Sequence, residues 1–179
     1  VDLSKVTPSL PDDMLSFLNA GDAAMQEAAK HINAAAHFAA ADVVIEAPMK
    51  RPPKILAIGL NYRAHAKESN MEIPKYPVVF TKQATSANGP YAPIHSPTET
   101  KMLDYEGELG LVIGKRCRRV SKDDASKVIA GFCVLNDVSV REWQFLATPP
   151  QFTMGKSWDT HNPFGPAIVT PDEVDPHNL

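Results

Sequence analysis

The sequence has 179 residues, of which 44% are hydrophobic, and its formal net charge at pH 7 is -3. This length suits one domain with a small appendage, and the composition is that of an ordinary soluble globular protein. No apolar run approaches the roughly 20 residues of a membrane-spanning helix. The slightly acidic charge gives no footprint for nucleic acid, so we expect neither nucleic acid nor a membrane as the partner.

The two cysteines, Cys117 and Cys133, have neither the spacing of a zinc site nor the density of a disulfide framework. Cys133 lies inside an apolar run, where a free thiol acts as a small hydrophobic side chain. We therefore expect reduced thiols and an intracellular location, cytoplasmic or mitochondrial.

Residues 1–48 predict a small helical appendage. Pro11-Asp12-Asp13 begins a short apolar helix that Gly21 ends. Asp22 is expected to cap a second, alanine-rich helix whose apolar positions continue at helical spacing to Ala39. Neither helix carries a motif with visible chemistry.

Residues 49–179 predict the domain that carries the chemistry. The expected strands are residues 54–60, 78–81, 104–114, 129–138 and 167–170. The expected helical segments are residues 61–68, 121–128 and 141–146, and residues 148–166 are expected to form a loop. Short strands joined by long proline-rich loops favour a β-rich α+β fold over a doubly wound sheet.

The strand predicted at 104–114 carries three acids, Asp104, Glu106 and Glu108, which an extended chain points to one face. Two carboxylates about 4 Å apart repel by about 4 kcal/mol at an effective dielectric of about 20, so this face either binds a cation or is solvated. Asp137 ends the next apolar strand and can complete a triangle with Glu106 and Glu108. Three carboxylates suit Mg²⁺, with Mn²⁺ or Ca²⁺ as substitutes. Alternatively, Asn136-Asp137 is a simple turn initiator.

Three further groups have both a chemical and an ordinary interpretation. His65 and Glu68 share one side of a predicted helix, either as a general base with its orienting carboxylate or as an exposed pair. Arg141 and Gln144 have the same spacing and either bind a substrate carboxylate or form a solvated turn. Lys156 either stabilises a developing enolate or is an ordinary surface lysine.

Four segments in this order, with these spacings, resemble the fumarylacetoacetate hydrolase family, most closely its domain-containing protein 2-like members. The resemblance runs from about residue 40 to the C-terminus. Its blocks are residues 57–68 (AIGLNYRAHAKE), 103–109 (LDYEGEL), 131–142 (GFCVLNDVSVRE) and 155–160 (GKSWDT), and residues 165–167 (GPA) close the series. Ordered blocks of this kind are far more specific than a single short motif.

The resemblance implies a role for each candidate residue. Glu106, Glu108 and Asp137 would bind the metal, while His65, oriented by Glu68, would activate water from a short lid helix. Lys156 would bind substrate and stabilise charge. Positions near the substrate in some members correspond to Arg141, Gln144 and Thr160. Asp104 is not a usual ligand, and Asn61 stands where larger members carry a further acidic ligand.

The resemblance also implies a fold and an activity. The fold is a mixed β-sandwich roll with short helices, usually a homodimer. The activity is Mg²⁺-dependent hydrolysis of carbon–carbon bonds in acylpyruvates, which are 2,4-dioxo acids. Decarboxylation of oxaloacetate at the same metal site and a catalytically inactive, metal-binding structural role are the alternatives.

The family continues beyond the position of Leu179, with further strands and a Thr-Gly-Thr-Pro loop at the active site. We therefore expect residues 49–179 to be the N-terminal part of the catalytic domain, and we expect this polypeptide alone to have weak activity or none.

Overall fold

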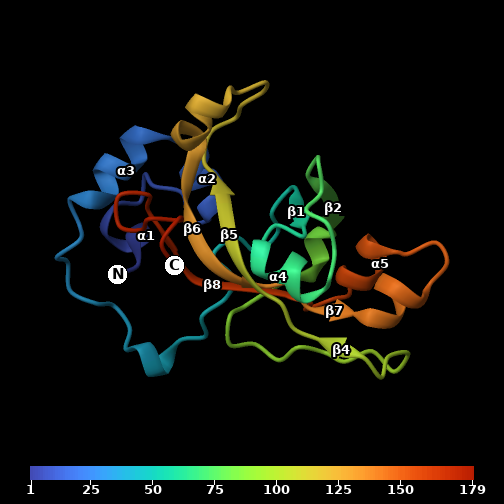
Figure 1. The fold of residues 1–179 in the computed structure, drawn as a ribbon. Helices are drawn as coiled ribbons and strands as arrows, with labels where there is room; N and C mark the ends of the chain where they lie inside the picture. Colours follow the sequence, from blue (N-terminus) through green and yellow to red (C-terminus); the bar gives the residue numbers. More distant parts are fainter.

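A computed structural model describes all 179 residues, which form three small sheets and several short helices (Figure 1). The strands are β1 (Ile55–Gly59), β2 (Val78–Lys82), β3 (Ala87–Asn88), β4 (Leu103–Asp104), β5 (Gly107–Ile113), β6 (Ile129–Asn136), β7 (Ser139–Val140) and β8 (Asn162–Val169). The α-helices are α1 (Leu3–Val6), α2 (Met14–Asn19), α3 (Asp22–Ala29), α4 (Arg63–Glu68) and α5 (Phe152–Lys156). The remaining helical turns are η1 (Ala40–Asp42), η2 (Ala84–Ser86), η3 (Lys122–Val128) and the π-helical η4 (Glu142–Leu146).

The largest sheet has the strand order β3-β8-β6-β5, and antiparallel pairing of β5 with β6 runs along its length. Cys133 on β6 and Phe164 on β8 are buried against Ala47, which comes from the end of the N-terminal segment. Two two-stranded sheets, β1-β2 and β4-β7, lie beside this sheet, on the side opposite helices α1 to α3 (Figure 1). Mixed sheets with few, short helices confirm the predicted fold class.

The acidic segment is not the single strand that its alternation predicted. Asp104 ends β4 and pairs with Ser139, whereas Glu108 lies in β5 opposite Leu135. The chain changes partner strand at Tyr105 and Glu106, which belong to neither strand. At this break a local contact takes the place of strand-to-strand hydrogen bonds. The Asp104 carboxylate accepts from the Tyr105 N–H. A simple strand face therefore does not describe the three acids.

The N-terminal helices are shorter than predicted. α2 begins as expected after Asp13, whose carboxylate accepts from the Ser16 N–H at 2.9 Å. α3 ends at Ala29 and not at Ala39, and Asp22 is its first residue rather than its cap. Ile32, three residues past the end of α3, is 81% exposed. Alanine-rich periodicity does not sustain a helix in water when no packing partner covers its apolar face.

The segment 148–166 was wrongly predicted as a loop, since it contains α5 and the first half of β8. Pro163 and Pro166 argue against a strand because proline has no N–H to donate to a neighbouring strand, and Gly165 does so because glycine weakens a strand interior. β8 accommodates them through an irregular register, in which Val134 faces Gly165 while Phe132 faces Val169. The irregularity leaves Pro166 outside the regular ladder.

Many apolar side chains on the strands are exposed. The accessible surface is 12687 Å², whereas a compact monomer of this mass would expose about 8,500 Å². Leu56 and Val79 on the β1-β2 sheet are 63% and 57% exposed, and Val134 on β6 is 73% exposed. These strand faces are therefore surfaces available for further packing. None of the helices has the length and apolar character needed to cross a bilayer.

Replacing Gly131 with alanine is expected to lower the free energy of unfolding by about 1–3 kcal/mol, as overpacking typically does. A Cβ at this position would clash with the Val169 carbonyl oxygen and come within 2.6 Å of Ile168 Cγ2, so β6 and β8 would have to separate. Urea unfolding measures the loss. Gly107→Ala is the matched control, because a Cβ there meets nothing within 4 Å. Equal effects of the two substitutions would contradict this account of the β6–β8 contact.

Candidate active site

Strand ends from all three sheets bring a cluster of charged side chains together. Lys82 is the last residue of β2, Glu108 lies near the start of β5, and Asp137 follows β6 directly. Glu106 comes from the break before β5, and Lys156 ends α5. The middle of the molecule, where these elements meet, therefore holds most of the chemistry that the sequence predicted.

Asp137 lies at the buried centre of the cluster, with a side chain only 5% exposed. Its Oδ1 accepts from Lys82 Nζ at 2.5 Å, and its Oδ2 accepts from Lys156 Nζ at 3.1 Å. The side chains of Lys82 and Lys156 are 1% and 2% exposed. A carboxylate this deeply buried is stable only when it is paired, and two ammonium groups pair it here.

Glu106 continues the same pattern outward. Its Oε2 lies 2.8 Å from Lys156 Nζ, and its Oε1 accepts from Arg141 Nη1 at 2.5 Å. Arg141 also donates Nε and Nη2 to Asp104 Oδ2, at 3.0 and 2.8 Å, and Nη1 to Gln144 Oε1 at 2.6 Å. The contacts therefore form one line of alternating charge, in the order Asp104, Arg141, Glu106, Lys156, Asp137 and Lys82.

The electrostatics of the two glutamates differ. Burial alone would raise the pKa of Glu106, but the neighbouring Lys156 and Arg141 outweigh it and hold that pKa below its usual range. Burial raises the pKa of Glu108, the hydrogen bond from Asn61 opposes this rise, and the charges of Glu106 and Asp137 add to it. Glu108 is therefore the carboxylate of the cluster that has no cationic partner of its own.

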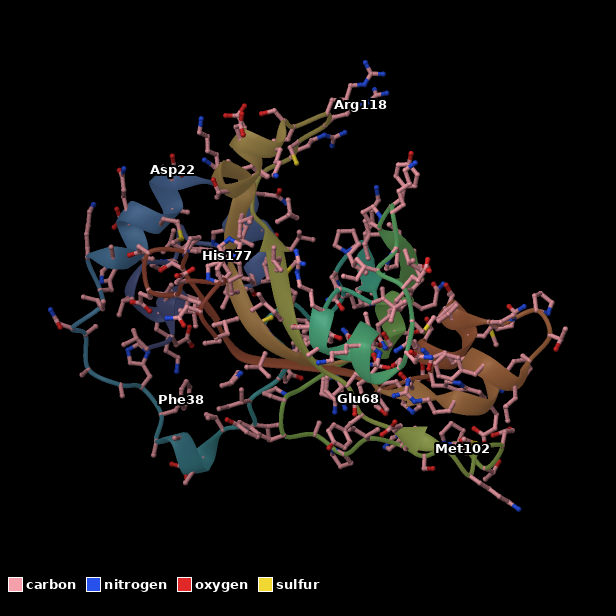
Figure 2. The ribbon with its side chains drawn as sticks, in the orientation of Figure 1. Asp22, Phe38, Glu68, Met102, Arg118 and His177 are labelled. Carbon is pink, nitrogen blue, oxygen red and sulfur yellow. The ribbon has the colours of Figure 1, made fainter.

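Contacts from Asn61 and Tyr62 attach the start of α4 to β5. Asn61 Nδ2 donates to Glu108 Oε2 and the Leu109 N–H donates to Tyr62 Oη, both at 3.3 Å. Glu68, at the other end of this helix, lies near the centre of the molecule in Figure 2. His65 and Glu68 are both exposed, and no hydrogen bond joins them. The predicted dyad therefore lies on a helix that is attached beside Glu108, but neither a hydrogen bond nor an ion pair joins its two side chains.

Two of the three candidate substrate-binding residues join the cluster. Gln144 is 5% exposed and contacts Arg141, so both residues lie beside Glu106. Thr160 instead uses its hydroxyl to accept from the His95 N–H at 2.8 Å, in a left-handed conformation with φ of 68°. Its contacts hold a loop in place, and the structure does not join it to the charged line.

Sequence reasoning missed two residues of the cluster. Lys82 directly follows the strand predicted at residues 78–81 and was given no role, although its spacing from Phe80 places both residues on one strand face. Ser139 is fully buried, and its hydroxyl lies 2.7 Å from Lys156 Nζ and donates to the Asp137 carbonyl oxygen at 2.9 Å. A lysine on an inward strand face was the available signal for Lys82, whereas nothing in the sequence marks Ser139.

The fit to a divalent cation rests on the donor set. No three His, Cys, Asp or Glu side chains are arranged to chelate an ion directly in this structure. However, a carboxylate offers about four acceptor sites, and each oxygen of Glu106 and Asp137 uses one of them on an ammonium or guanidinium group. Glu108 adds a carboxylate without a cation. These hard oxygen donors suit Mg²⁺ and similar ions.

Residues 54–179 match the family described as fumarylacetoacetate (FAA) hydrolase C-terminal. The chain belongs to the fumarylacetoacetate hydrolase family. Oxaloacetate tautomerase fahd2, mitochondrial, of Xenopus laevis is 41% identical over 181 residues, covering 100% of this chain and 57% of that protein. Oxaloacetate tautomerase FAHD2A, mitochondrial, of Homo sapiens is 40% identical, covering 100% of this chain and 58% of that protein. The resemblance stated from the sequence is confirmed.

Solved structures of fumarylacetoacetate hydrolase-like proteins share this fold. A putative HpcE protein from Mycobacterium smegmatis superposes with a TM-score of 0.83 at 34% identity, over 97% of this chain and 61% of that chain. Fumarylacetoacetate hydrolase from psychrophilic Exiguobacterium antarcticum has a TM-score of 0.70 at 32% identity, over 96% and 60%. This chain therefore spans about three fifths of the length of the relatives that it matches.

Asp137→Asn is expected to lower the free energy of unfolding of the metal-free protein by about 3–5 kcal/mol, the typical cost of removing one member of a buried ion pair. The amide leaves Lys82 and Lys156 buried without the carboxylate that pairs them. Urea unfolding at pH 7 measures the effect.

Glu108→Gln is the matched control for that substitution. Glu108 lies beside two carboxylates and pairs with no cation, so its neutralisation is expected to leave the free energy of unfolding unchanged or slightly raised. A loss of stability in Glu108→Gln as large as that in Asp137→Asn would contradict this electrostatic assignment.

Proposed function

We propose that the cluster binds a small 2-oxo acid together with a divalent cation and interconverts its keto and enol forms, with oxaloacetate as the substrate. One observation carries the proposal, namely that the Lys156 side chain is 2% exposed and its ammonium group lies between Glu106 and Asp137. A buried, preorganised positive charge of this kind stabilises negative charge that develops on a substrate. The names of the vertebrate relatives, oxaloacetate tautomerases, support the choice of substrate.

The cation would be held by Glu106, Glu108 and Asp137, and Mg²⁺ suits these oxygen donors best, with Mn²⁺ or Ca²⁺ as substitutes. When bound, it supplies Lewis acidity that polarises the 2-oxo group of the substrate. Charge favours its binding, because Glu108 is the carboxylate that lacks a cationic partner. Asp104 takes no direct part, since its carboxylate orients Arg141.

The protein side chains have separable tasks in this proposal. Lys156 Nζ stabilises the enolate oxygen as it gains charge, while the proton lost from C3 passes to solvent water and the enolate oxygen takes up a proton from water to give the enol. Gln144 keeps its amide nitrogen free of protein partners while its oxygen accepts from Arg141, so Nε2 can donate to a substrate carboxylate. Thr160 would contribute to substrate binding only after the loop that it shares with His95 rearranges.

Hydrolysis of acylpyruvates is the second candidate, and the attachment of α4 beside Glu108 favours it. His65 Nε2 or Nδ1 would take a proton from water, oriented by Glu68, and the water oxygen would add to the acyl carbonyl carbon. The bond from that carbon to the pyruvyl CH₂ group then breaks, and pyruvate leaves as its enolate beside Lys156. The two side chains must first approach each other, because no hydrogen bond joins them in the structure.

Loss of CO₂ from oxaloacetate also yields a pyruvate enolate, so decarboxylation is a third outcome of the same site. A screen that resolves products separates these activities in a protein that spans the whole family domain. Enol absorbance reports tautomerisation, pyruvate from oxaloacetate reports decarboxylation, and pyruvate with a carboxylic acid from acylpyruvates reports hydrolysis. Absence of all three, with Mg²⁺ bound, would assign a structural role and overturn the proposal.

His65→Ala and Glu68→Gln are expected to abolish acylpyruvate hydrolysis while tautomerisation of oxaloacetate persists, since only hydrolysis needs an activated water. Steady-state assays of both reactions on each variant measure the separation, and calorimetry should show unchanged Mg²⁺ binding. The double variant Glu106→Gln/Glu108→Gln is the control, because it should lose Mg²⁺ binding and both activities together. Full hydrolysis in His65→Ala would remove this residue from the mechanism.

We further propose that the protein acts as a homodimer, and in mitochondria. The exposed apolar faces of β1-β2 and of β6 support the first point, because apolar patches of this extent are typical of interaction surfaces. The mitochondrial relatives support the second. Sedimentation velocity should give twice the mass of the chain, and a monomer at micromolar concentration would argue against the dimer.

A further inference from the structure

Lys82 is the feature of the cluster to which the proposed reaction assigns no task. It is 4% exposed, and its ammonium group makes two contacts, with Asp137 Oδ1 at 2.5 Å and with the His161 carbonyl oxygen at 3.0 Å. Burying the flexible side chain and the charge of a lysine is costly unless the charge is paired. The fold therefore commits a buried cation to one oxygen of Asp137.

The two contacts of Lys82 join separate parts of the fold. Lys82 ends β2 of the β1-β2 sheet, whereas Asp137 follows β6 and His161 precedes β8 of the large sheet. The His161 carbonyl oxygen also accepts from the Val138 N–H at 3.2 Å, next to Asp137 in the chain. One ammonium group thus ties the end of β2 to the Asp137 side chain and to the backbone at His161.

Lys82 and Lys156 hold the two oxygens of Asp137 separately. Lys156 takes Oδ2 at 3.1 Å and also contacts Glu106 and Ser139, so it cannot replace the contact that Lys82 makes to Oδ1. With both oxygens held, the plane of the carboxylate is fixed. Without Lys82, the carboxylate is free to rotate about its χ2 torsion, which is broad and weakly restrained for aspartate.

We propose that Lys82 is a positioning residue that orients Asp137 for the divalent cation, an inference that rests on the proposed metal-dependent function. Outer-shell partners of metal ligands orient them in this way, and their loss typically weakens metal binding 10- to 100-fold. Lys82 touches neither substrate nor cation in this scheme. It acts through Asp137.

The direction in which Mg²⁺ affinity changes when Lys82 is removed shows whether Lys82 orients Asp137 or only neutralises its charge. An ammonium group beside a metal ligand repels the incoming cation. If Lys82 did nothing more than neutralise Asp137, its removal would tighten Mg²⁺ binding. If it orients the carboxylate, its removal weakens Mg²⁺ binding in spite of the lost repulsion.

Calorimetric titration of Mg²⁺ into the whole chain, at a temperature where each variant is folded, tests the proposal. Lys82→Met keeps the apolar stem and removes the charge, and it should bind Mg²⁺ about 10- to 100-fold more weakly than the wild type. Lys82→Arg keeps the charge in a bulkier, planar group, and its affinity should lie between the two. Lys54→Met, which removes an exposed lysine just before β1, should match the wild type.

The outcomes separate failure of this inference from failure of the proposed function. Wild-type protein that binds no Mg²⁺ would overturn both. Wild-type binding with equal or tighter binding in Lys82→Met would overturn the positioning role alone, as would a Lys82→Arg variant no better than Lys82→Met. If Lys82→Met does not fold, Lys82→Gln takes its place, and equal or tighter Mg²⁺ binding in that variant would be the contradicting result.

A double-mutant cycle adds a readout that does not depend on metal. Melting temperatures of the metal-free wild type, Lys82→Met, Asp137→Asn and the double variant measure the coupling between the two side chains. If Lys82 acts through Asp137, the fall in melting temperature of the double variant should be clearly smaller than the sum of the falls in the two single variants. Additive losses would show that Lys82 stabilises the fold independently of Asp137, and would contradict the proposal.

Discussion

The structure of the site depends on one constraint, the burial of Asp137 with two ammonium groups on its oxygens. A carboxylate that is 5% exposed cannot stay ionised alone, so the fold must deliver cations from elsewhere in the chain. Lys82 and Lys156 come from opposite sides of it in sequence, 55 residues before and 19 residues after. This requirement explains why β2 and α5, which pair with neither β5 nor β6, end at the same place.

The alternating line of charges extends this constraint outward to the surface. Lys156 shares its charge between Asp137 and Glu106, and Arg141 shares its charge between Glu106 and Asp104. The inner three side chains are at most 5% exposed, whereas Glu106 is 26% and Asp104 is 47% exposed, so the outer ion pairs contribute less because water screens them. The inner pairs therefore fix the buried carboxylates, while the outer pair mainly orients Arg141.

Sequence reasoning located most of the longer strands and named several charged residues that the structure brings together, because both depend on local signals. β1, β2 and β6 follow apolar runs, and Glu106, Glu108 and Asp137 lie within the residues 54–179 that match the family. The break at Tyr105 and Glu106 was not visible, because it arises when the chain changes partner from β7 to β6. Strand partners are long-range properties, and alternation within one segment carries no information about them. The same reason hid Lys82, whose importance comes from a contact 55 residues away.

The lack of a hydrogen bond between His65 and Glu68 contrasts with the paired charges around Asp137. The carboxylates and lysines are already paired and buried, so the part of the site that stabilises an enolate is preorganised. Hydrogen bonds from Asn61 and to Tyr62, at 3.3 Å in each case, attach the start of α4 to β5, Ala66 within the helix is buried, and the two catalytic candidates are exposed. In the proposed scheme, enolisation would use only this preorganised part, whereas hydrolysis would also need α4 to order over the substrate. The structure therefore holds one group of candidate residues by buried ion pairs and leaves the other, His65 and Glu68, exposed to solvent.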